Sequence, residues 1–366
     1  MILSPSSTSG AGSQNMGGTQ QAQEILPESS LMFREAAQCA EIVRLQRERI
    51  AGPIEQIVLR LRQSEPRAVV TLARGSSDHA ATFARYLIET RAGVLTSSAP
   101  PSVGSIYESM PDLAQTVVLA ISQSGRSPDL LAAAERAADR GALLIAMVND
   151  EESPLAARAD ILVPLSAGTE RSVAATKSFI ASLSAILHLL AAWTGAEEIR
   201  NALVALPEKL AQAWSLDWSP ALAELTSAQS MYVVGRGHAL GVAQEAALKL
   251  KETCGIQAEA FSAAEVRHGP MAVVRGGFPV LLMGQKDESL ESVSALADEF
   301  GKRGARLLSA GVPNAPGIRL PILKADPLTA PILQIASFYR MANSLAFARG
   351  QDPDRPLHLT KVTETL

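Results

Sequence analysis

The stretch TVVLAISQSGRSPD, from Thr116 to Asp129, is the clearest indication of the fold of this chain. Its first part, Thr116 to Ile121, is nearly continuous in apolar, β-branched residues, which is typical of a strand buried on both faces of a parallel sheet. The apolar run stops at Ser122. Ser127 and Pro128 then open an Ala-rich helical stretch, because serine suits the N-cap and proline suits the first helical position. We therefore predict a strand, a hydroxyl-rich loop and a helix N-terminus in direct succession.

Such a loop is suited to a compact dianion. Free backbone N–H groups and the positive end of the helix dipole meet there. The hydroxyls of Ser122, Ser124 and Ser127 add neutral donors, and Gly125 lets a ligand approach the backbone closely. We predict that these serines and Gln123 bind a phosphate group, such as that of a sugar phosphate. An ordinary strand-to-helix turn that happens to be rich in serine is the alternative.

Composition excludes several classes of function. The chain has 366 residues, which indicates about two domains, and a net charge of −4 without a basic block, which argues against nucleic-acid binding. Cys39 and Cys254 lie far apart and form no metal-type spacing, so we expect a reduced, cytoplasmic setting and no metal. The apolar region Phe179 to Trp193 is too short and too polar for a membrane span and predicts a buried helix. We expect neither a signal peptide nor an organic cofactor.

Strands and helices alternate along the chain, which indicates doubly wound parallel sheets. We expect a break at Gly52-Pro53 to divide the N-terminal helical region into two helices. The predicted organisation is a disordered tail over 1–30, N-terminal helices over 31–62, a phosphate-binding domain over 63–200, a helical linker over 201–222, a second domain over 223–350 and a C-terminal tail over 351–366.

Landmarks recur along the chain at nearly one offset. Arg74-Gly75 and Arg236-Gly237 are as far apart as Gln123 and Gln285. This regularity predicts a duplicated domain. In the second copy the loop contains Asp287, whose carboxylate would repel a phosphate, so we expect the first copy to hold the ligand.

Five motifs in order carry a resemblance to a known family. They are GSSDHA at Gly75–Ala80, SQSGRSPD at Ser122–Asp129, SVAATKSF at Ser172–Phe179, EAALKLKETCGIQAEAFSAAEVRHGP at Glu245–Pro270, and RPLHLTKVTETL from Arg355. Together they resemble the double SIS (sugar isomerase) family. The resemblance is to the isomerase half of glutamine–fructose-6-phosphate aminotransferase (glucosamine-6-phosphate synthase) and to stand-alone SIS-type glucosamine-6-phosphate deaminases. It implies two tandem doubly wound SIS domains of three-layer α/β/α, flavodoxin-like form, with N-terminal helices and a C-terminal tail over the site.

The sequence departs from the synthase in two respects. It starts MILSP and leaves no room for a glutaminase, so we expect no ammonia production from glutamine. Ala175 stands where the synthase usually has serine, and Arg126 where an acidic residue is common. By resemblance, Val173 and Ala175 line the sugar pocket, and Ser76 and Ser77 of the first glycine turn add to the phosphate site.

The family's chemistry moves a proton between C1 and C2 of a sugar, which needs a base poised over the carbon chain. By resemblance Glu252 is that base. It follows a predicted helix, Val242 to Thr253, and Lys249 lies one turn back, on the same face. Lys249 could keep Glu252 ionised or contact the open-chain hydroxyls. A solvated helix carboxylate paired with a neighbouring lysine is the alternative.

Two further residues carry expected roles by resemblance. His268, in the segment RHGP, would open and close the sugar ring, a task suited to imidazole, and would reach the site of a neighbouring subunit in a homodimer. Lys361 would fold over the site and contact the open chain, with a Schiff base as one option. A turn histidine and a solvated surface lysine are the alternatives. His79 and His238 are expected to cap or pack at their glycine turns.

The favoured function is that of an amino-sugar-phosphate deaminase/isomerase, which converts glucosamine-6-phosphate and water to fructose-6-phosphate and ammonia. A fructosamine-phosphate deglycase or a simple sugar-phosphate isomerase is a related alternative. A sugar-phosphate sensor that binds without turnover is an alternative of another class, although such a sensor would not need Glu252, His268 and Lys361 together.

Overall fold

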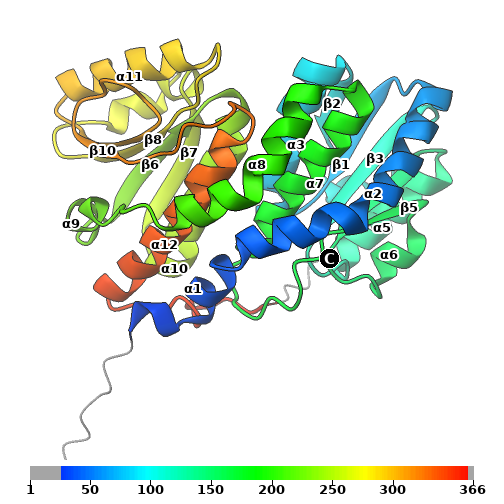
Figure 1. Ribbon diagram of the computed structural model, residues 1–366, viewed down its shortest axis with the longest axis horizontal. Coiled ribbons are helices and arrows are strands. Elements are labelled where there is room, and N and C mark those ends of the chain that lie inside the picture. The colour runs from blue at the N-terminus through cyan, green and yellow to red at the C-terminus, as the bar shows by residue number, and fades with distance from the viewer. Residues whose placement is uncertain (1–25, 362–366) are drawn as a thin grey trace, which may run out of the picture.

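Two parallel five-stranded sheets form the frame of the protein, and Figure 1 shows them side by side. The computed structural model describes residues 26–361. The first sheet has the order β2-β1-β3-β4-β5 and the second β7-β6-β8-β9-β10, so both are wound in the same way. All pairings between these strands are parallel. The predicted fold class and its duplication are therefore confirmed.

The strands are β1 (Ala68–Leu72), β2 (Leu95–Ser98), β3 (Thr116–Ser122), β4 (Leu143–Val148), β5 (Ile161–Pro164), β6 (Ser230–Gly235), β7 (Gln257–Ser262), β8 (Pro279–Met283), β9 (Arg306–Ala310) and β10 (Ile318–Leu320). The α-helices are α1 (Leu31–Ala36), α2 (Cys39–Ser64), α3 (Ser76–Leu87), α4 (Pro101–Ser105), α5 (Pro128–Asp139), α6 (Pro154–Arg158), α7 (Lys177–Thr194), α8 (Glu197–Trp214), α9 (Pro220–Leu225), α10 (Leu240–Cys254), α11 (Leu290–Lys302) and α12 (Ala330–Ala348).

The apolar run of β3 is continuous because both faces of the first sheet are covered. Val117, Leu119 and Ile121 join the large core that also contains residues of α2, α3 and α7. Val118 and Ala120 point the other way, into a smaller core shared with α5. A strand flanked by helices on both sides has no polar face, which is why its sequence does not alternate.

The predicted break at Gly52-Pro53 is wrong, because α2 runs through it from Cys39 to Ser64. Proline removes one hydrogen bond, whose acceptor would be the carbonyl of Arg49. Arg49 is exposed, so water can reach that turn, whereas Ile50, Ile54 and Ile57 are buried in the core. Burial of this apolar stripe keeps the helix continuous across a residue that usually interrupts one.

Other local predictions need correction as well. The predicted disorder extends too far, because Pro27–Ser29 form a 3₁₀ turn and Ser30 caps α1, where its side chain accepts from the N–H of Phe33; residues 1–25 lie outside the described part of the chain. β7, β10 and α12 are not among the elements predicted from the sequence. The strand β7 was missed because, although it lies within a motif, its residues are largely half-exposed or exposed and show no strong apolar pattern.

Within residues 26–361, α7 is long and apolar enough to cross a membrane, but 78% of it is buried inside the protein. It contacts α2, α3 and α8. Its apolar surface is therefore satisfied by protein, and the prediction of a buried helix here is confirmed.

The two sheets are joined through a close contact between α3 and α10. At Gly241, in the first turn of α10, an added Cβ would lie 2.4 Å from the carbonyl oxygen of His79. Only glycine permits this approach. The helix that follows β6 therefore lies directly on the helix that follows β1, so side chains from the second domain can reach the first.

Asp287, in the second copy of the loop, has a lower pKa in the folded protein than in the unfolded chain. Its carboxylate accepts from Ser289 Oγ at 2.6 Å and Gln285 Nε2 at 2.8 Å, and it lies 3.3 Å from His238 Nδ1. Burial raises the pKa of Asp287, but these partners outweigh it and lower the pKa to about 2.

The folded pKa of Asp287 lies below the unfolded value of 3.8. The ionised carboxylate therefore contributes fully to the free energy of unfolding above about pH 4, and this contribution is lost as the pH falls through 2. We expect Asp287→Asn to lower the free energy of unfolding by roughly 2 kcal/mol near neutral pH, and by much less at pH 2. Urea unfolding at both values measures this. An equal difference at the two pH values would contradict it.

Candidate active site

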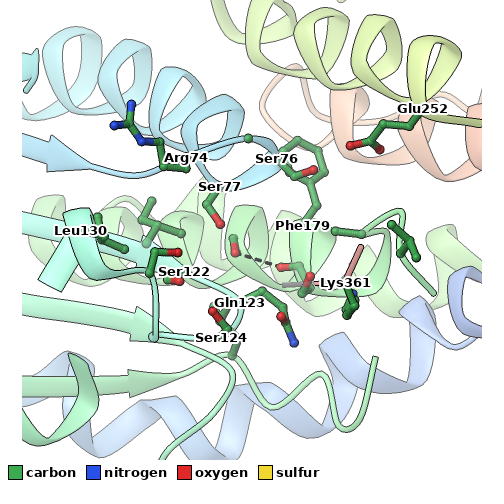
Figure 2. A pocket seen from close by; sticks show the side chains of 18 of the residues that line it. Arg74, Ser76, Ser77, Ser122, Gln123, Ser124, Leu130, Phe179, Glu252 and Lys361 are labelled. Carbon is green, nitrogen blue, oxygen red and sulfur yellow. Dashed lines mark hydrogen bonds between the residues drawn. The ribbon is translucent and has the colours of Figure 1, made fainter. Parts of the chain in front are cut away.

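A cavity of about 610 Å³ opens at the carboxyl ends of β1 and β3. It is lined by residues that follow these two strands, by the loop before α7, by α10 and by the C-terminal segment. The predicted residues that line it are Ser76, Ser77, Ser122, Gln123, Ser124, Ser127, Val173, Ala175, Lys249, Glu252 and Lys361. Figure 2 shows Glu252 extending from α10 on the opposite side of this space from Ser122 and Ser124.

The position follows from the strand order. β1 and β3 are neighbours, but the chain leaves them on opposite faces of the sheet, since α3 packs in the large core and α5 in the smaller one. This is the point where a doubly wound sheet leaves a crevice beyond its carboxyl edge. The N-termini of both helices open towards that crevice, so the field there favours an anion.

The loop after β3 holds its shape with its own hydroxyl oxygens. Ser122 Oγ accepts from the N–H of Gly125 at 2.9 Å, and Ser124 Oγ accepts from the N–H of Arg126 at 3.3 Å. A hydroxyl that accepts from the backbone still has its own hydrogen to donate. Both serines can therefore donate to a ligand without loss of the loop conformation.

Three further polar side chains at the cavity have no hydrogen-bond partner within residues 26–361: Ser77, Gln123 and Ser127. Ser127 occupies the predicted N-cap position of α5, but its side chain makes no capping hydrogen bond. These groups are neutral donors aimed at one space, which suits a phosphate monoester.

Gly125 is the residue that this loop most strictly requires. Its φ is +62°, and an added Cβ would lie 2.2 Å from Ser153 Oγ, the hydroxyl that caps α6. Both the left-handed backbone and the lack of space exclude other residues.

Arg74 lines the cavity but is already paired. Its Nε and Nη2 donate to Asp129 Oδ2 at 2.9 and 2.6 Å, and Asp129 is 2% exposed. The pair ties the turn after β1 to the first turn of α5. The two halves of the phosphate site are thereby held together, while the cation is neutralised before any ligand binds.

α10 brings a cluster of charged groups to the far wall. Lys249 Nζ donates to Glu252 Oε2 at 2.5 Å and lies 3.3 Å from Glu245 Oε1. Burial lowers the pKa of the Lys249 ammonium, but the carboxylates of Glu245 and Glu252 outweigh it and raise that pKa overall. Lys249 is therefore a fixed cation beside Glu252, as the one-turn spacing predicts. The side chain of Glu252 is 21% exposed and lines the cavity.

Lys361 reaches the cavity from the end of the described chain. Figure 1 shows the segment after α12 running back from the second domain to the first. Lys361 Nζ donates to the carbonyl of Ser172 at 2.6 Å and lies 3.5 Å from Glu170 Oε2. Glu170 is buried and also accepts from the N–H of Thr176 and from Ser178 Oγ. Glu170 is not among the site residues predicted from the sequence.

The N-terminal helix α1 also makes hydrogen bonds to the loop before α7. Glu35 of α1 accepts from the N–H groups of Arg171 and Ser172 at 2.7 and 3.1 Å. Asp354 in the C-terminal segment accepts from the N–H groups of Leu31 and Met32 at the start of α1. α1 thus links the tail to the loop that carries Val173 and Ala175. Neither carboxylate has a local sequence signal, because each acts on backbone far away in the chain.

His268 is the predicted catalytic residue that the structure does not bring to this cavity. It is exposed, directly after the 3₁₀ turn Glu265–Arg267. His79 contacts Glu245 Oε2 at 3.0 Å and His238 contacts Asp287, so both pack at their turns as expected. Within residues 26–361, no group of three or more histidine, cysteine or acidic side chains has metal-binding geometry.

Comparison with known sequences identifies the two repeats. The sequence profile of the SIS domain matches residues 62–192 and 224–310. A glutamine–fructose-6-phosphate aminotransferase of Gloeobacter violaceus is 34% identical over 311 residues, which are 80% of this chain and 51% of that protein. The corresponding enzyme of Aeropyrum pernix is also 34% identical, over 80% of this chain and 50% of its own. This chain therefore spans about half the length of the curated relatives it matches.

Comparison with solved structures gives the same picture. A Silicibacter pomeroyi DSS-3 protein described as a "putative phosphosugar isomerase" is 39% identical, with a TM-score of 0.85 over 89% of this chain and 100% of that one. The Thermotoga maritima glucosamine-6-phosphate deaminase shares the fold, with a TM-score of 0.69 and 23% identity over 92% of this chain and 100% of that one.

Proposed function

This chain belongs to the SIS domain family, and we propose that it is an enzyme that deaminates and isomerises a phosphorylated amino sugar. The reaction is glucosamine-6-phosphate plus water to fructose-6-phosphate plus ammonia. The observation that carries the proposal is a single cavity with neutral hydroxyl donors at one end and the Glu252–Lys249 pair at the other. That arrangement suits a substrate with a dianion at one end and a proton to be moved at the other.

In this proposal the phosphate binds at the strand-to-helix loops. The hydroxyls of Ser77, Ser122, Ser124 and Ser127 and the amide of Gln123 donate to its oxygens. The N-termini of α3 and α5 supply a favourable field without a mobile counter-ion.

Ser76 lines the cavity too, but its hydroxyl donates to Glu245 and accepts from Lys249. Ser76 therefore belongs to the charged cluster on α10 and not to the phosphate donors.

The carbon chain then lies beneath α10. Glu252 moves the proton between C1 and C2, and the fixed ammonium of Lys249 keeps its carboxylate in place. Lys361 contacts the open chain from the other side, and its amine can form a Schiff base with a ketose carbonyl. The proton shift leaves an imine at C2, the carbon that carries the amine. Water then adds at C2 and ammonia leaves, which gives the ketose.

The proposal includes a homodimer in the cytoplasm, in which His268 acts on the sugar ring in the partner's site. The exposure of His268 and its position outside the cavity of its own chain support this assignment.

Of the two positions at which the sequence departs from the synthase, only Ala175 lines the cavity. Arg126 pairs with Asp150 at 2.8 Å and does not line the cavity, so its charge lies outside the site. Ala175 does line the cavity and leaves the sugar without a hydroxyl at that point. This difference favours a second candidate of the same class, a deglycase or simple isomerase for a related sugar phosphate.

A screen of sugar phosphates tests the proposal. We expect ammonia and fructose-6-phosphate in equal amounts from glucosamine-6-phosphate. Ketose without ammonia from an aldose phosphate would point to a simple isomerase. Thermal stabilisation by sugar phosphates without any turnover, unchanged in the Glu252→Gln variant, would favour the sensor and reject the enzyme.

A further inference from the structure

Glu245 is a fully buried carboxylate that the proposed mechanism does not yet use. Its Oε1 accepts from Ser76 Oγ and from the hydroxyl of Tyr339, each at 3.1 Å, and lies 3.3 Å from Lys249 Nζ. Its Oε2 lies 3.0 Å from His79 Nδ1. Four polar groups therefore converge on one side chain.

These partners come from both halves of the molecule. Ser76 and His79 belong to the first two turns of α3 in the first domain. Lys249 lies one turn beyond Glu245 on α10, and Tyr339 lies on α12. Glu245 is thus a junction between the helix that begins at the phosphate site and the helix that carries Glu252.

The charges and hydrogen bonds around Glu245 hold these side chains in one arrangement. Burial raises the pKa of Glu245, but Lys249, His79 and Ser76 outweigh it, so the pKa falls overall and the carboxylate is ionised. Ser76 Oγ accepts from Lys249 Nζ at 3.2 Å while it donates to Glu245, which closes a ring of three groups. A buried ion pair with all its hydrogen bonds made is costly to distort.

We propose that Glu245 is a positioning residue that sets the distance and orientation between the phosphate site and Glu252. One end of its network fixes Ser76, whose neighbour Ser77 lines the phosphate site. The other end fixes Lys249, which holds Glu252. This inference rests on the proposed function.

Removal of the charge should act on catalysis through Lys249. In Glu245→Gln the ammonium keeps only Glu252 as a full counter-charge and draws that carboxylate towards itself. A misplacement of about 1 Å in a catalytic group can cost about 100-fold in rate. We therefore expect kcat for the phosphosugar to fall about 100-fold, while KM stays within about threefold because the phosphate loops are unchanged.

The pH profile separates positioning from a general loss of packing. Lys249 faces Glu245 and Glu252 on its own helix. The other titratable groups of the network, His79 on α3 and Tyr339 on α12, contact Glu245. Loss of the Glu245 charge lowers the pKa of Lys249, so the alkaline limb of kcat should move to lower pH. Glu245→Asp keeps the charge, so this limb should stay in place while kcat falls less than in the glutamine variant.

Asp287→Asn is the matched control, because Asp287 is another buried carboxylate in contact with a histidine and lies outside the cavity. We expect it to lose stability but to keep the kcat and pH profile of the wild type. The inference is overturned if a folded Glu245→Gln keeps kcat within twofold and its alkaline limb, or if Asp287→Asn shifts both equally.

If Glu245→Gln does not fold, Glu245→Asp decides: kcat and KM both at wild-type values reject the inference, whereas a fall in kcat at unchanged KM supports it. A wild-type protein that turns over no sugar phosphate rejects the proposed function itself. An active wild type with unaffected Glu245 variants rejects only the positioning role.

Discussion

The Glu252→Gln variant is expected to lose about 10²- to 10⁴-fold in kcat on the phosphosugar, the range for removal of a general base. Its KM should change little, because the phosphate loops lie on the opposite side of the cavity. The amide has the size of the carboxylate but cannot accept the proton from the carbon chain. Initial rates of ketose formation and calorimetric binding of the sugar phosphate measure the two effects separately.

Glu291→Gln is the matched control for this experiment. Glu291 lies in the first turn of α11, is exposed, and does not line the cavity. The same chemical change there should leave kcat and KM at wild-type values. If Glu252→Gln is as active as this control, Glu252 is not the base.

The second large effect is expected at the phosphate loop. Ser124→Asp places a carboxylate among the donors that face the ligand. Two unit charges about 4 Å apart repel by about 4 kcal/mol at an effective dielectric constant of 20. Solvent in the open cavity screens part of this repulsion, so we expect KM to rise at least about 100-fold, or about 2.7 kcal/mol. Saturation kinetics measure this change.

Ser124→Ala separates repulsion from the loss of a donor. The alanine variant removes one hydrogen bond to a charged group, worth about 1.5–3 kcal/mol, and should raise KM about 10- to 100-fold. Isothermal titration with inorganic phosphate should show the same order: wild type, alanine, aspartate. Equal affinities in all three proteins would place the phosphate elsewhere.

Elements that depend only on neighbouring residues could be predicted from the sequence. The apolar run of β3 is uniform because a parallel strand is buried on both faces, so composition alone reveals it. The turn from Ser122 to Pro128 is fixed by local backbone chemistry, including the left-handed glycine at Gly125. The repeated landmarks gave the duplication. The motif resemblance brought Glu252, Lys249 and Lys361 to attention, and all three line the cavity.

Which of these groups meet, and which residues support them, depends on contacts between segments that are distant in the chain. Glu245 contacts Ser76 and His79 although 169 and 166 residues separate them in the chain. Glu35 and Asp354 act on backbone N–H groups that no periodic pattern marks. The continuity of α2 through Pro53 depends on burial against another helix. Hydrogen bonds and packing between distant segments depend on how whole elements dock. Local sequence therefore specifies the strands, turns and donors, while docking of α10 on α3 creates the site.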